Sequence, residues 1–271
     1  MRIRVSHTTR YSFDGPIVHG LQRLRLKPKS THGQQVIDWR MDLDGAVVEG
    51  EYDDHNHNCT TLVSIRPGAE AIAVTCEGTI ETRDNAGVIG QHGGHMPLWC
   101  FVNQTPLTKP GARLRALISG LDLDRRETLA SLHRLKDAVH GAVRYETGRT
   151  DASTTAEDAL AAGVGVCQDH AHAFIGAARQ LGVPARYVSG YLLMDDRIEQ
   201  DAGHAWAEAH VAGLGWVGFD VANRICPNDH YVRVATGCDY SEAAPVTGMS
   251  VGGGQTDLSV RLAVEQQGAE Q

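Results

Sequence analysis

One cysteine of this chain, Cys167, stands at the start of a helical pattern. Residues 163–166 read Gly-Val-Gly-Val, which predicts a turn leading into it, and apolar residues recur behind it with helical spacing up to about Leu181. A thiol in the first turn of a helix feels the positive end of the helix dipole, which favours the thiolate. Because the thiolate is the form that attacks a carbonyl carbon, the position predicts a nucleophile.

A thiolate nucleophile needs a histidine that shares its proton and a third group that orients that histidine. His204 opens an alternating run at 204–211, which predicts a strand with one polar or aromatic face. A short turn leads into a returning strand at 216–220 that ends with Asp220. We expect Cys167 to be the nucleophile, His204 the general base and then acid, and Asp220 the group that orients and stabilises the imidazole.

The register of this hairpin decides whether His204 and Asp220 can meet. Directly opposed residues share one face of a hairpin, so the two side chains meet only across an odd loop or a bulge. A five-residue loop at 211–215 places Asp220 opposite Trp206 and diagonal to His204, with roughly 7–8 Å between the backbones. A four-residue loop would place the carboxylate on the opposite face. We therefore predict an odd loop or a bulge.

An acyl-transfer site also needs donors for the oxyanion of its tetrahedral intermediate. The backbone N–H of Cys167 is one expected donor, and a side chain from an upstream loop is the other, with Tyr145 as its candidate. Gln168 and Trp206 adjoin the expected nucleophile and base and are further candidates for oxyanion or substrate contacts.

The first half of the chain carries a second group of potential ligands, His55, His57 and Cys59. On a strand, these alternating positions would share one face and could bind zinc or copper. The alternative is a polar turn or strand edge beside the acidic pair at 53–54. The turn is favoured, because strong metal sites usually draw a further pair of ligands from elsewhere in the chain.

The composition limits the classes of partner that the protein is expected to bind. Lys and Arg total 25 against 33 Asp and Glu, for a net charge of −8 without a long basic run, which argues against nucleic acid and anionic membranes as partners. The N-terminus lacks the apolar run of a signal peptide, and no stretch approaches the roughly 18 apolar residues of a membrane span. We expect a cytoplasmic protein whose six cysteines are free thiols. No particular oligomeric state is predicted.

The chain changes character near residue 105. Before it, short alternating runs separated by turn residues predict an antiparallel sandwich or barrel, and after it helical spacing becomes frequent. The Gly- and Pro-rich segment at 87–110 predicts the boundary. We predict an α+β protein with a β-rich domain over 1–105 and a catalytic domain over 106–271, which includes a C-terminal strand at 258–264.

Several motifs of the second half resemble the transglutaminase-like superfamily. They occur in the same order as in that family and lie at residues 165–169, 182–191, 203–208 and 215–220. The resemblance covers about residues 155–220 closely and the rest of the C-terminal half more loosely. The first hundred residues resemble the β-rich N-terminal region that accompanies this domain in bacterial proteins described as candidate cysteine proteases.

The resemblance implies a papain-like α+β core with Cys167, His204 and Asp220 as its catalytic triad. It implies no cofactor and no metal, because the bacterial branch often lacks the calcium sites of animal transglutaminases and the chain has no EF-hand-like loop. The implied function is thiol-dependent cleavage of a peptide or other amide-containing substrate through a thioacyl intermediate. Hydrolysis is favoured, since no feature indicates an amine site; transfer of protein glutamine to an amine and a non-enzymatic binding module are the alternatives.

Overall fold

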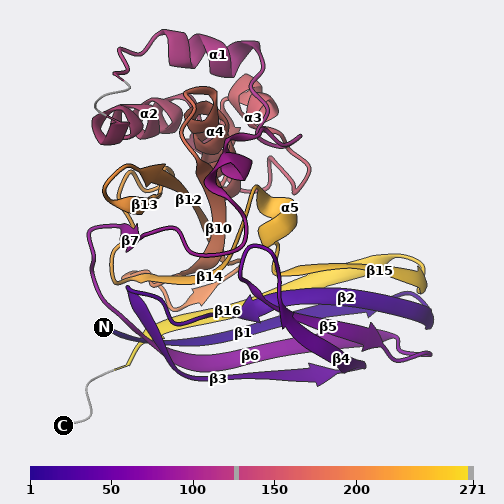
Figure 1. The fold of residues 1–271 in the computed structure, drawn as a ribbon. Coiled ribbons are helices and arrows are strands. Elements are labelled where there is room, and N and C mark those ends of the chain that lie inside the picture. Colours follow the sequence, from indigo (N-terminus) through magenta and orange to yellow (C-terminus); the bar gives the residue numbers. More distant parts are fainter. Residues whose placement is uncertain (125–127, 268–271) are drawn as a thin grey trace.

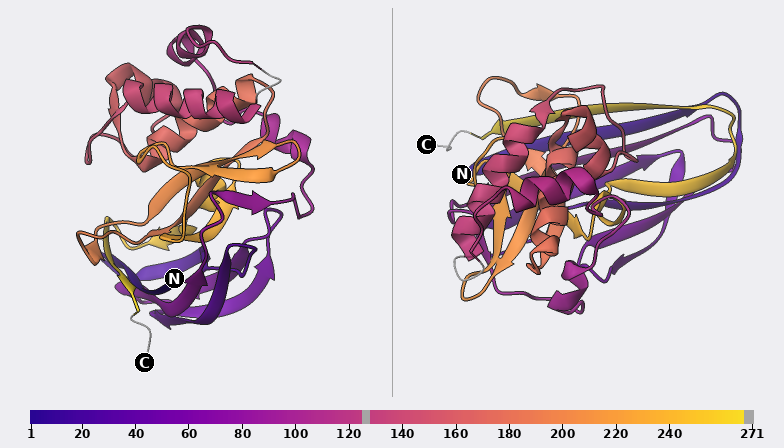
Figure 2. Two further views of the ribbon diagram at one scale, coloured as in Figure 1. Left: turned by 90° about the vertical axis from the view of Figure 1, so that its left-hand side faces the viewer. Right: turned by 90° about the horizontal axis from the view of Figure 1, so that it is seen from above.

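The computed structural model describes residues 1–124 and 128–267. Helices cover one face of a central antiparallel sheet, and a β-sandwich lies on the other side of that sheet (Figure 1). The left view of Figure 2 shows the same succession of helices, central sheet and sandwich. The β-rich first half followed by helices and an antiparallel sheet confirms the predicted α+β class.

The sandwich consists of two sheets. The first has the strand order β11-β16-β1-β6-β3 and the second the order β15-β2-β5-β4. The strands of the first sheet are β1 (Arg2–Phe13), β3 (Gln34–Asp44), β6 (Ala71–Thr82), β11 (Glu199–Gln200) and β16 (Thr256–Gln266). Those of the second are β2 (Ile17–Lys27), β4 (Ala46–Asp53), β5 (Cys59–Ile65) and β15 (Val246–Gly252). Apolar residues from both sheets, among them Leu24, Val63 and Val74, form one buried cluster, so the sandwich alternative of the sequence prediction is the one observed.

The central sheet has the strand order β14-β10-β12-β13-β7. Its strands are β7 (Val88–Gly90), β10 (Ala185–Leu192), β12 (His204–Val211), β13 (Gly215–Phe219) and β14 (Tyr231–Gly237). The helices are η1 (Leu98–Val102), α1 (Ala112–Ser119), α2 (Thr128–Ala142), α3 (Ala156–Ala162), α4 (Cys167–Gln180) and α5 (Tyr240–Ala243). A two-stranded parallel sheet joins β8 (Arg144–Tyr145) to β9 (Val164–Gly165).

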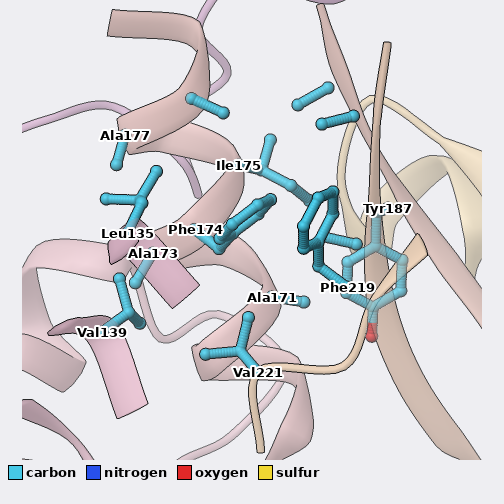
Figure 3. Packing of buried hydrophobic residues seen from close by; sticks show 14 of the residues in the cluster. Leu135, Val139, Ala171, Ala173, Phe174, Ile175, Ala177, Tyr187, Phe219 and Val221 are labelled. Atoms are coloured by element: carbon cyan, nitrogen blue, oxygen red, sulfur yellow. The ribbon is translucent and has the colours of Figure 1, made fainter. Parts of the chain in front are cut away.

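Helix α4 is the most deeply buried helix, and its packing fixes the position of its first residue. Phe174 is fully buried and stacks on Phe219 of β13 with ring centroids 5.0 Å apart. Figure 3 shows the two rings side by side in one buried cluster that also includes Leu135 and Val139 of α2. The helix ends where predicted, because Gly182 adopts a left-handed conformation (φ 81°) just beyond its C-cap.

The two halves of the chain share buried contacts. Ile3 and Val5 of β1 belong to one apolar cluster with Tyr191 of β10 and Val232 of β14. The C-terminal strands also return to the sandwich, since β16 pairs with β1 and β15 pairs with β2. The division of the chain into two domains at residue 105 stays a prediction. Strands β15 and β16, which follow the central sheet in the chain, belong to the two sheets of the sandwich. Among the described residues, no helix is both long and apolar enough to cross a membrane.

The α4 core gives a stability prediction. We expect Phe174→Ala to lower the free energy of unfolding by about 3–5 kcal/mol, because it leaves a cavity under the helix that carries Cys167. Met249→Ala, at a position 73% exposed on β15, serves as the control and should change the same quantity by less than about 0.5 kcal/mol. Urea unfolding measures both, and equal losses would contradict the packing described.

Candidate active site

Cys167 is the first residue of α4, and the segment before it is held from several sides. Strand β9 pairs in parallel with β8, which brings Gly165 opposite Tyr145. The Asp169 carboxylate accepts hydrogen bonds from the Val166 N–H and the Thr150 hydroxyl, both at 2.7 Å. Asp169 thus caps the helix as its position in the first turn predicts.

Gly165 allows this close approach. A Cβ atom at this position would lie 2.7 Å from the Asp169 carboxylate oxygen Oδ2. Any larger residue would push the carboxylate away from the backbone that it caps. The glycine therefore helps to aim the first turn of α4, including the unpaired N–H groups that every helix N-terminus presents.

The hairpin of β12 and β13 has the predicted odd register. Val211 pairs with Gly215 and Ala207 pairs with Phe219, so the loop between the paired residues has three members and Asp220 follows opposite Trp206. The backbone of Asp220 exchanges two hydrogen bonds with Ile225, at 2.9 and 3.1 Å, which holds the residue at the end of β13. The carboxylate consequently lies on the same face of the hairpin as His204.

The Asp220 carboxylate is fully buried and accepts four hydrogen bonds. Oδ2 accepts from His204 Nε2 at 2.7 Å, from the Tyr231 hydroxyl at 2.6 Å and from Asn223 Nδ2 at 2.8 Å. Oδ1 accepts from the backbone N–H of Asn223 at 3.1 Å. Burial acts against the charge, yet these hydrogen bonds, led by that of His204, keep the pKa of Asp220 below its usual value. The group is therefore a buried carboxylate anion with a fixed orientation.

The His204 imidazole lies between this carboxylate and the Cys167 thiol. Burial disfavours its charged form, but hydrogen bonds with Asp220 and Cys167 outweigh burial and raise its pKa from 6.5 to about 10. Since Nε2 is bonded to Asp220, Nδ1 is the nitrogen left to take the thiol proton. The arrangement places an imidazole that can accept a proton beside the thiol, as a nucleophilic cysteine requires.

A cavity of about 280 Å³ adjoins these groups. Its lining includes Cys167, Gln168 and His204 together with residues of the sandwich strands β1, β2 and β16. A reactive thiol, an imidazole and an adjoining concave, mostly apolar space are the features of a small-molecule or peptide site.

The three residues predicted from the hairpin and helix thus meet in space, while the other three candidates lie in different surroundings. Gln168 lines the cavity. Tyr145 lies opposite Gly165, is 52% exposed and stacks on His170 with ring centroids 6.2 Å apart. Burial and the charges of Cys167 and Asp220 raise its pKa to about 12, so its hydroxyl stays a proton donor at neutral pH.

Trp206 is only 2% exposed and is not among the residues that line the cavity. Its ring stacks on His204 with centroids 6.3 Å apart and packs against one face of the imidazole. Roles for Tyr145, Gln168 and Trp206 in binding an oxyanion or a substrate stay predictions.

The candidate ligands of the first half form a polar turn. The Asp54 carboxylate accepts from the backbone N–H groups of Asn56 and Asn58, both at 2.9 Å, and His57 has a positive φ of 64°. His55 and His57 thus lie in this turn, whereas Cys59 begins β5. The described residues contain no group of three or more side chains arranged to hold a metal ion.

The sequence reasoning missed two residues that bond to Asp220. Asn223 has a local signal, because Asp and Asn both favour turns and an Asp side chain often accepts a hydrogen bond from a backbone N–H a few residues on. Tyr231 has no such signal. It reaches the site because β14 pairs with β10, which places Tyr231 opposite Leu192 in a register that no local pattern encodes.

Comparison with protein families agrees with this geometry. Residues 115–221 match the model of the transglutaminase-like superfamily, and residues 3–81 match that of the bacterial transglutaminase-like N-terminal region. The chain belongs to the transglutaminase-like superfamily.

Relatives of similar length share this organisation. An uncharacterised protein of Mycobacterium leprae is 29% identical over 279 residues, which cover 96% of each chain. An uncharacterised protein of Mycobacterium tuberculosis is 26% identical over 275 residues, covering 92% of this chain and 87% of the relative. A crystal structure from Cytophaga hutchinsonii, described as that of a candidate cysteine protease, superposes with a TM-score of 0.75 at 20% identity over all of this chain and 92% of the other. That similarity shows a shared fold.

The raised pKa of His204 predicts how stability depends on pH. Because the pKa of His204 is higher in the folded than in the unfolded state, its protonation stabilises the folded protein. This contribution is complete below about pH 6.5 and is lost as the pH rises through about 10. The free energy of unfolding should therefore fall between these pH values, and the fall should be smaller in Asp220→Asn, which removes the anionic partner. Urea unfolding at pH 6.5 and 10 measures both.

Asp196→Asn is the matched control, because Asp196 is an exposed aspartate outside the site. This variant should follow the pH dependence of the unsubstituted protein. If the stability of Asp220→Asn showed the same pH dependence as that of the unsubstituted protein, the charged imidazole assigned to His204 would be wrong.

Proposed function

We propose that the protein is a thiol-dependent amide-bond hydrolase, a cysteine protease or amidase, that acts through a thioacyl intermediate on Cys167. The observation that carries the proposal is the hydrogen-bonded series from the buried Asp220 carboxylate through the buried His204 to the half-buried thiol at the start of α4. Its position beside a mostly apolar cavity supports a peptide or other amide-containing substrate.

The first half of the reaction forms the thioester. The imidazole of His204 takes the Cys167 proton, and the thiolate attacks the carbonyl carbon of the amide. The backbone N–H of Cys167 donates to the oxyanion that develops on the carbonyl oxygen. As this intermediate collapses, the C–N bond breaks and the imidazolium gives its proton to the departing amine.

The second half regenerates the enzyme. Water enters, His204 removes one of its protons, and the resulting hydroxide adds to the thioester carbonyl. Collapse of this second intermediate breaks the C–S bond, releases the carboxylic acid and returns the proton to sulfur. Asp220 stays ionised throughout and stabilises the imidazolium at each stage where it forms.

The proposal also includes the cellular compartment and the kind of partner. All six cysteines are free thiols, which supports the predicted reducing, cytoplasmic setting. The net charge of −8 supports a peptide or small amide as the partner over nucleic acid or an anionic membrane.

One incubation distinguishes the candidate reactions. The protein is mixed with short glutamine-containing peptides and a fluorescent primary amine in ¹⁸O-labelled water, and mass spectrometry follows the products. Hydrolysis predicts an acid product that carries ¹⁸O. Amine transfer predicts a fluorescent adduct without ¹⁸O and would replace the hydrolase assignment, whereas absence of both products together with absence of an acylated Cys167 would indicate a binding module.

The nucleophile is tested by a matched pair of substitutions. Cys167→Ala should lower turnover by roughly 1,000-fold or more, because it removes the group that forms the intermediate. Cys59→Ala, at a thiol in the sandwich strand β5, should leave turnover unchanged. Comparable losses in the two variants would contradict the assignment.

A further inference from the structure

The cavity beside Cys167 lies where the sandwich meets the central sheet. Its walls include β1, β2 and β16 of the sandwich, β10 and β12 of the central sheet, and the segment around α5. Its volume of about 280 Å³ lies at the small end of the range typical of ligand sites. A space of this size suits a small ligand or the end of a short peptide.

A buried arginine of the sandwich, Arg25 of β2, lines this cavity and is only 5% exposed. Its Nε donates to Asp54 at 3.0 Å, and its Nη1 lies 3.5 Å from the Thr247 hydroxyl. Within the described part of the chain, Nη2 has no hydrogen-bond partner. Since Nη2 is not among the fully buried unpaired atoms and Arg25 lines the cavity, this nitrogen can donate to an acceptor that arrives with a ligand.

The partner of Arg25 is already saturated. Besides the guanidinium, the Asp54 carboxylate accepts from the backbone N–H groups of Asn56 and Asn58 and from Asn58 Nδ2. These donors spread the negative charge of Asp54 and fix its position. The ion pair therefore holds Arg25 in place and leaves Nη2 to donate to a second carboxylate.

Tyrosine hydroxyls add further donors to the same cavity. Tyr187 is 2% exposed, and Figure 3 shows its hydroxyl oxygen pointing out of the apolar cluster that holds its ring. In the described residues, the hydroxyls of Tyr11, Tyr187 and Tyr240 have no hydrogen-bond partner, although all three residues line the cavity. Burial raises the pKa of Tyr187 well above its usual range, so its hydroxyl remains a donor. An apolar space with a few convergent donors is typical of a site for a small polar ligand.

We propose that this cavity binds a short amide substrate that carries a free carboxylate, and that Arg25 is the residue that recognises the carboxylate. Because Cys167 and Arg25 line the same small cavity, the proposal places the attacked amide at Cys167 and the carboxylate within one or two residues of it. This inference rests on the proposed function and adds its substrate class: small N-acylated amino acids or the ends of short peptides.

The test compares two ligands that differ only at the group Arg25 would bind. N-acetylphenylalanine carries a carboxylate, and N-acetylphenylalaninamide replaces it with a carboxamide. Each is added at increasing concentration while iodoacetamide alkylates Cys167, and peptide mass spectrometry gives the concentration that halves the alkylation rate. We expect the carboxylate ligand to protect at a concentration about tenfold lower than the amide.

Substitutions assign the preference to Arg25. Arg25→Gln should abolish the difference between the two ligands, whereas Arg10→Gln, at an exposed arginine of β1, should keep it. Because Arg25→Gln leaves Asp54 buried without its cation, the double variant Arg25→Gln/Asp54→Asn, which removes both charges, provides a second test and should also lack the preference. A preference that persisted in either folded variant would overturn the assignment.

The outcomes separate this inference from the proposed function. If Cys167 reacts rapidly but the two ligands protect it equally, or neither protects it, the carboxylate site is wrong and the nucleophile assignment stands. If Cys167 reacts no faster than the other thiols, the proposed function itself fails.

Discussion

The hydrogen bond between His204 and Asp220 is the contact on which the account of this site depends. It joins a buried carboxylate to a buried imidazole at 2.7 Å, and it sets which ring nitrogen faces the thiol. Tyr231 and Asn223 also donate to the carboxylate and, together with His204, keep it charged in spite of its burial. The thiol, the imidazole and the carboxylate therefore work as a unit, and the elements around them serve to hold that unit in one geometry.

The polar face of β12 is secured by a second buried group of charges. Glu208 is fully buried and accepts from Arg186 at 2.6 Å and from Arg233 at 2.8 Å, while Arg186 lies 4.0 Å above the Trp216 ring. Removing one partner of such a group typically costs about 3–5 kcal/mol, because a charge is left buried and unpaired. The group ties β12 to β10 and β14, and thereby fixes the strand that begins with His204.

The sequence was sufficient to predict the parts of the site that depend on local pattern. Helical spacing located α4 and its first residue, and strict alternation placed His204 on a strand with a returning partner whose odd register the structure confirms. Tyr231 and Arg25 were not predictable in this way. Each reaches the active-site region through strand pairing between distant segments, as when β2 pairs with the C-terminal strand β15, and no local periodicity records which strands become neighbours.

The central claim is that Cys167 alone among the six thiols is activated, and competitive iodoacetamide labelling across a range of pH tests it most directly. Burial raises the pKa of Cys59 to about 11 and those of Cys76 and Cys238 to about 12, so these thiols stay protonated near neutral pH. The account predicts that Cys167 is alkylated first at pH 7, at least about tenfold faster than any other cysteine. Alkylation of Cys167 no faster than the other five would contradict it.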